Sequence, residues 1–168
     1  MKSAFFALLI ASGVLDSAEP EFISQQISAQ GAKSAVQQIF EDKKKLAQVL
    51  AGISTGSRSW LAVANQLHSA ADAGASEQLA LSVGAALEYR PENALSIAAS
   101  EFGVDAICSG PDVDDARYDS YELAIGAIKK RQEMLRTISD QHLLAERDAC
   151  IASLEKAKLG IVNFYERR

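Results

Sequence analysis

Apolar residues recur at intervals of three and four along most of this sequence, which contains only 3 prolines. The stretch "SWLAVANQLHSAA" places them at i, i+3, i+4 and i+7, the pattern of a helix that buries one face. No segment alternates apolar and polar residues over the length of a strand. The sequence therefore predicts an all-α protein, a single-domain antiparallel helical bundle with short stacked helical hairpins.

Breaks in the apolar pattern mark the ends of the expected helices. Short connections between them indicate antiparallel neighbours. Trp60 heads the stripe of its helix, and we expect it to anchor the core. The expected helices cover Glu21–Gln30, Ala35–Ile53, Ser59–Ala71, Ser76–Tyr89, Pro91–Gly103, Asp115–Ile138 and Asp140–Phe164.

The sequence contains 2 cysteines, Cys108 and Cys150. Cys108 precedes the helix-breaking pair Gly110 and Pro111, in the least regular part of the chain. In an oxidising compartment the two thiols would form a disulfide. This bridge would close a loop of about 40 residues and stabilise the fold by roughly 4 kcal/mol. The alternatives are two reduced buried thiols in a cytosolic protein, or a zinc site that would also need both histidines.

The N-terminus has the order of a secretory signal peptide: Lys2, an apolar run over Ala4–Val14, then small and polar residues before Pro20. The run is shorter than the ~20 residues that span a bilayer, so we expect no permanent anchor. Cleavage after Ala18 would remove residues 1–18 and leave residues 19–168 as one domain, periplasmic or secreted. The alternative is a buried N-terminal helix.

Five short stretches carry a resemblance: "WLAVANQL", "DAGASEQL", "RPENAL", "ICSGP" and "RDAC". Together they resemble a family of small exported helical proteins of Gram-negative bacteria, over most of the chain after the signal. The resemblance implies the same signal, helices and paired cysteines, and it adds a bacterial periplasm. It implies no activity and no site.

An acidic cluster follows the first cysteine: Asp112, Asp114, Asp115, Asp119 and Glu122. It is not a calcium loop, because an arginine occupies the sixth position, where glycine is needed, and a leucine the twelfth. We expect these aspartates to cap the helix that begins at about residue 115, whose far end carries the complementary charges Lys129, Lys130, Arg131 and Arg136. A rigid acidic corner could also bind a cationic partner.

Candidate nucleophiles and bases are weakly supported. The sequence lacks G-x-S-x-G, and the S-x-x-K match at Ser153–Lys156 lacks its companion motifs. His68 follows a core leucine, and we expect a half-exposed helix residue there in preference to a base. His142 lies in the first turn of a helix, where an imidazolium is disfavoured. We therefore expect no enzyme, no metal and no cofactor.

Charge and surface residues narrow the partners. A net charge of −5 argues against nucleic acid. The three lysines at Lys43–Lys45 are expected on a solvated helix face, with Glu41 pairing with Lys45; binding of anionic lipid or glycan is the alternative. A ligand pocket could lie near Trp60 and the Asp72–Ser76 turn.

These observations favour a non-enzymatic periplasmic protein that acts through protein–protein contact centred on Ser109–Tyr121, with an inhibitor or immunity-type protein as the leading example. The alternatives are a module of the cell envelope that binds a small ligand or lipid and, last, an envelope hydrolase.

The mature protein is expected to lack residues 1–18 and to weigh two hydrogens less than its reduced sequence, because export would remove the leader and oxidise the thiols. Intact-mass spectrometry of native material under non-reducing conditions measures both. A full-length chain with two free thiols would contradict the export hypothesis.

Overall fold

The computed structural model describes residues 19–167, which contain helices and turns and no strand. The all-α class predicted from the sequence is confirmed. The expected signal peptide lies outside the described residues. The elements in chain order are α1 (Pro20–Gln30), α2 (Ala32–Glu41), α3 (Lys43–Ser54), α4 (Arg58–His68), α5 (Ala73–Ala86), α6 (Pro91–Asn93), the π-helical turn η1 (Ala94–Ala98), α7 (Ala99–Phe102), α8 (Val104–Ile107), the 3-10 turn η2 (Ala116–Tyr118), α9 (Tyr121–Arg136), the 3-10 turn η3 (Gln141–Leu143) and α10 (Leu144–Glu166).

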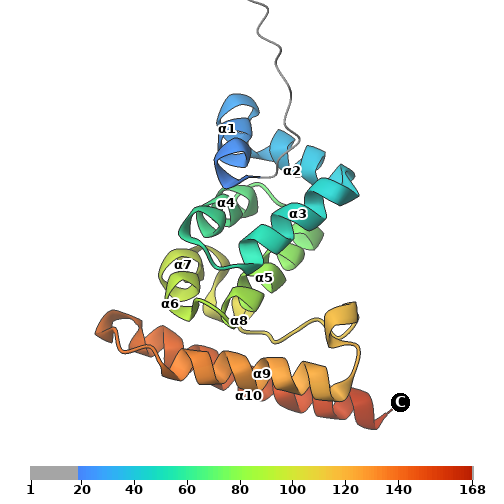
Figure 1. Ribbon diagram of the computed structural model, residues 1–168, viewed down its shortest axis with the longest axis vertical. Helices are drawn as coiled ribbons and strands as arrows, with labels where there is room; N and C mark the ends of the chain where they lie inside the picture. Colours follow the sequence, from blue (N-terminus) through green and yellow to red (C-terminus); the bar gives the residue numbers. More distant parts are fainter. Residues whose placement is uncertain (1–18, 168) are drawn as a thin grey trace, which may run out of the picture.

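The first eight helices form a stack of short hairpins, and the long pair α9 and α10 lies across one end of it (Figure 1). Helix α5 is central, because it packs against α3, α4 and α8. Contacts of α8 with α10 and of α6 with α9 join the stack to the long hairpin. Among the described residues, no helix is long and apolar enough to cross a bilayer.

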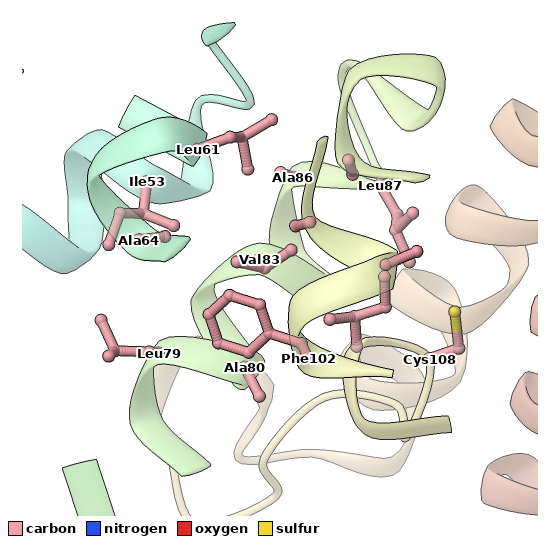
Figure 2. Packing of buried hydrophobic residues seen from close by; sticks show 14 of the residues in the cluster. Ile53, Leu61, Ala64, Leu79, Ala80, Val83, Ala86, Leu87, Phe102 and Cys108 are labelled. Carbon is pink, nitrogen blue, oxygen red and sulfur yellow. The ribbon is translucent and has the colours of Figure 1, made fainter. Parts of the chain in front are cut away.

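The core runs through the stack between α3, α4, α5 and the short helices that follow them (Figure 2). The stripe predicted on α4 is buried at Val63, Ala64 and Leu67. Trp60 is only half-buried; its indole covers the backbone of Gly52, where no other side chain has room. Fully buried core residues shown in Figure 2 include Ile53, Leu61, Ala64, Leu79, Val83, Ala86, Leu87 and Cys108.

The expected continuous helix over Ala35–Ile53 is wrong, because the chain breaks at Asp42. This residue leaves the helical region at φ −98° and ψ 98°, and its carboxylate accepts a hydrogen bond from the amide of Lys45. An aspartate in this position caps the next helix. The break also separates Glu41 from Lys45, and the lysine Nζ donates instead to Gln26 Oε1 at 2.7 Å.

The long helix also begins later than expected. Helix α9 starts at Tyr121 and its cap is Ser120, whose hydroxyl accepts from the amide of Leu123 at 3.3 Å. Asp115, the expected start, caps the separate turn η2 through the amide of Arg117. The expectation that the aspartates cap this helix is therefore wrong, because a serine nearer the apolar stripe takes that position.

The predicted disulfide between Cys108 and Cys150 is confirmed. The Cα atoms are 5.3 Å apart and the bridge spans 42 positions. Cys108 directly follows α8 and Cys150 lies in α10, and both are fully buried. The bond therefore joins the helical stack covalently to the closing hairpin, at the point where the irregular loop leaves the stack.

Helices α5 and α8 approach closely at Gly84. A Cβ atom on this residue would lie 2.5 Å from the carbonyl oxygen of Ile107 and 3.7 Å from Nη1 of Arg131. The backbone oxygen cannot move away without shifting α8, which directly precedes the disulfide. Glycine at this position therefore sets the distance between the two helices.

Gly84→Ala is expected to lower the free energy of unfolding by about 1–3 kcal/mol, the usual cost of overpacking a core. The matched control is Gly126→Ala in α9, where a Cβ meets nothing within 4 Å. This control should gain up to about 1 kcal/mol from helix propensity. Urea denaturation measures both, and equal effects of the two substitutions would contradict the close approach.

Candidate functional site

The segment between the disulfide and α9 runs from the end of α8 out beside the stack and then to the start of the long hairpin (Figure 1). We call Ser109–Ser120 the acidic loop. The side chains of Asp112, Asp114 and Asp119 are exposed, as is that of Glu122 in the first turn of α9. Among residues 19–167, no lysine or arginine forms an ion pair with these four carboxylates. The structure therefore leaves the charge of these four carboxylates exposed to solvent.

Asp115 is the exception within the cluster. Arg117 Nη2 donates to its Oδ2 at 2.7 Å, and Nε donates to its Oδ1 at 3.1 Å. These hydrogen bonds lower the pKa of Asp115 and raise the pKa of Arg117. The pair fixes the turn η2, and it partly neutralises the loop at this residue.

The acidic loop is held at both ends. Near its start, Gly110 adopts a φ of 95°, which favours glycine, and a Cβ there would approach Ala157 of α10 at 3.0 Å. Near its end, the hydroxyl of Tyr165 donates to the carbonyl of Tyr118 at 3.2 Å. Together with the disulfide, these contacts attach the loop to α10, so its carboxylates are presented on a defined backbone.

Beneath the loop lies a buried ion pair. Arg131 of α9 is 1% exposed, and its Nε donates to Glu88 Oε1 at 3.2 Å. The hydroxyl of Tyr118 lies 3.4 Å from the same oxygen, and Lys130 Nζ approaches Oε2 at 3.7 Å from the solvent side. Burial raises the pKa of Tyr118. This cluster joins α9, the loop and the segment after α5.

One guanidinium nitrogen of this cluster, Nη1 of Arg131, has no hydrogen-bond partner among the described residues. It lies beside Gly84, in the last turn of α5. The carbonyl groups at a helix C-terminus carry partial negative charge, so a cation is favoured there. Arg131 therefore lies between the carboxylate of Glu88 and the C-terminus of α5. Both carry negative charge, which stabilises the positive guanidinium.

Sequence reasoning missed this cluster. It grouped Arg131 with Lys129, Lys130 and Arg136 as charges that complement the far end of the helix, and it did not predict that Arg131 is buried. The available signal was spacing: Arg131 lies three positions after Ile128 and four before Leu135, both fully buried. An arginine inside an apolar stripe indicates a buried cation that needs a partner.

A groove runs along α5, with the acidic loop on one side and α3 on the other; we call it the α5 groove. It consists of three adjoining hollows of about 510, 620 and 670 Å³. Leu81 and Asp112 line both the first and the second. Ala51, Ala85 and Tyr118 line both the second and the third. No pattern in the sequence predicts this groove, because the residues that line it come from segments far apart in the chain.

Neither histidine lines the three hollows of this groove. His68 is half-buried as expected, with Nδ1 3.3 Å from Glu101 Oε1 and its ring stacked on Phe102 at 4.0 Å. It lines a hollow of about 420 Å³ that also includes Ala73 and Ser76 of the Asp72–Ser76 turn, but Trp60 does not line this hollow. His142 is exposed in η3. Within residues 19–167, no three His, Cys, Asp or Glu side chains are grouped to hold a metal ion.

Comparison with family models, with curated proteins and with solved structures finds no match for this chain.

Arg131→Met is expected to lower the free energy of unfolding by about 3–5 kcal/mol, because it leaves Glu88 buried without its partner. Adding Glu88→Leu should restore most of that loss, since an apolar pair of similar volume replaces an ion pair at little cost.

The matched control is Lys130→Met, which removes a half-exposed cation from the other oxygen of Glu88. Its expected cost is below about 1 kcal/mol. Chemical denaturation of wild type, Arg131→Met, Glu88→Leu, the double variant and Lys130→Met measures the coupling. If the two core substitutions destabilise additively, the ion pair does not join the elements as described.

Proposed function

We propose that this protein is a non-enzymatic exported protein that acts by binding another protein through the surface Ser109–Tyr121. One observation carries the proposal: the backbone of the loop is attached to α10, while no lysine or arginine among residues 19–167 forms an ion pair with Asp112, Asp114, Asp119 or Glu122. A fixed surface loses little conformational freedom on binding, so more of the contact energy appears as affinity. Exposed charges of one sign select a partner of the other sign and speed its approach.

The partner is a protein with a cationic surface. Asp112, Asp114, Asp119 and Glu122 would face it directly, and Asp115 would hold the shape of the loop through Arg117. An inhibitor or immunity-type protein directed against a toxin or an envelope enzyme fits this arrangement, because such a protein needs a stable complementary surface and no chemistry of its own.

The disulfide supports an exported location. Protein disulfides form and persist in the periplasm and outside the cell, and they are rare in the reducing cytosol. The bridge is buried and joins the loop to α10, so the same oxidation that marks the compartment would also fix the binding surface. On this proposal the protein is assembled in its active form only after export.

Replacing Asp112, Asp114 and Asp119 by asparagine is expected to reduce partner recovery roughly ten-fold. The reason is that these substitutions remove the negative charge that attracts a cationic partner. Asparagine keeps the size of each side chain, and at Asp112 it keeps an oxygen for the amide of Asp114. The measurement is quantitative cross-linking in extract from the bacterial envelope, with the bound proteins identified by mass spectrometry.

The matched control removes the same charge elsewhere, at the exposed residues Glu21, Glu92 and Glu133 changed to glutamine. Recovery should be unchanged in this control. An equal loss in both triple variants would indicate non-specific attraction to net charge. Unchanged recovery in the loop variant would exclude the surface.

A further inference from the structure

The two ends of the α5 groove differ in charge: one end is acidic, and the other carries both signs. At the end near the start of α5, the charged side chains that line it are the carboxylates of Glu77, Asp112 and Asp114. At the other end, Glu88 is accompanied by Arg90 and Arg117. A bound molecule with separated charges would therefore be oriented, with its cations at the first end.

In the middle of the groove, small and apolar residues of α3 and α5 lie opposite Asp115 and Arg117 of the acidic loop. Ala47 and Ala51 of α3 line one side of it, and Leu81 and Ala85 of α5 line its floor. Ala47 and Ala51 are exposed and lie one turn apart. Small residues on one wall leave space between the helices that apolar side chains of a partner would fill.

The length of the groove suits a peptide segment. Its lining extends along α5 from Gly74 to Glu88, just after the end of the helix. At 1.5 Å per residue this distance is about 20 Å, the length of a helix of about four turns. Recognition of an amphipathic helix in such a groove uses apolar residues spaced along one of its faces.

We propose that the α5 groove binds a basic amphipathic segment of the partner protein, with its lysines or arginines at the Glu77–Asp112–Asp114 end and its apolar side chains against the alanines of α3. This inference rests on the proposed function and specifies the chemistry of the partner.

Charge selects this occupant over two others. An anionic lipid surface would be repelled by the carboxylates at the first end. A second copy of the chain carries the same net charge of −5, which opposes self-association. Of its three clustered lysines, Lys45 is engaged within the chain, because it donates to Gln26 and lies over the ring of Phe22.

The probe is a fluorescein-labelled synthetic peptide of about fourteen residues, with lysines at one end and leucine and alanine along one helical face. Saturable binding is expected by fluorescence anisotropy. The peptide with glutamate for lysine should bind at least about ten-fold more weakly. Amide NMR shifts on titration should concentrate along α5, the exposed face of α3 and the acidic loop.

Ala51→Lys should weaken binding of the probe at least about ten-fold, because it fills the groove and adds a repelling cation. Ala62→Lys is the control, since it adds the same side chain at an exposed alanine of α4 that lines none of the three hollows. Affinity weaker than about 1 mM, equal effects of the two lysines, or shifts spread over all exposed carboxylates would each overturn the proposal.

Cross-linking in envelope extract separates this inference from the proposed function. If the loop variant with three asparagines loses the partner and Ala51→Lys keeps it, the loop binds and the groove inference is wrong. If both variants lose the partner, the proposed function and the groove inference are both supported. If both variants keep the partner, both proposals are wrong.

Discussion

The pairing of Arg131 with Glu88 is the interaction on which the arrangement of the two halves depends. It takes a cation from the long hairpin and a carboxylate from the end of α5, and it buries both beneath the acidic loop. Two buried charges are tolerated only when they satisfy each other, so the hairpin cannot shift along the stack without exposing an unpaired charge to an apolar interior. A shift of the hairpin along the stack would separate Arg131 from Glu88, so the ion pair favours the observed register over its neighbours.

The disulfide fixes the same joint in a different way. It links α8 to α10, whereas the ion pair links the end of α5 to α9, so each half of the hairpin has its own connection to the stack. The covalent bond acts mainly by restricting the unfolded chain, and the ion pair acts by specifying the folded one. Gly84 lies between the two, where α5 meets both α8 and the guanidinium of Arg131. A change in the spacing at this glycine would therefore disturb both connections.

The sequence was informative where one local signal decided the structure. Helical spacing predicted the class, and two cysteines in a chain with a signal-like N-terminus predicted their bridge. It failed where two local signals competed: Asp42 ends one helix and caps the next, and Ser120 caps α9 in place of Asp115. It failed again where tertiary contact reversed a local preference, since Arg131 is buried by a partner 43 positions away. The α5 groove was out of reach, because Ala51, Ala85 and Tyr118 become neighbours only in the folded chain.

The distribution of charge around the loop follows from this construction. Two carboxylates that support the fold are paired with arginines: Glu88 in the interior with Arg131, and Asp115 at the turn η2 with Arg117. Within residues 19–167, Asp112, Asp114, Asp119 and Glu122 form no ion pair, so their charge is left to act on a partner. Screening at physiological salt extends over about 8 Å, so these charges act on a partner only at close approach. Apolar contact along α3 and α5 is not screened. A partner that contacted both the acidic loop and the α5 groove would be selected by charge and retained by apolar packing. The Arg131–Glu88 pair and the disulfide beneath the loop would hold these two surfaces in a constant relative position.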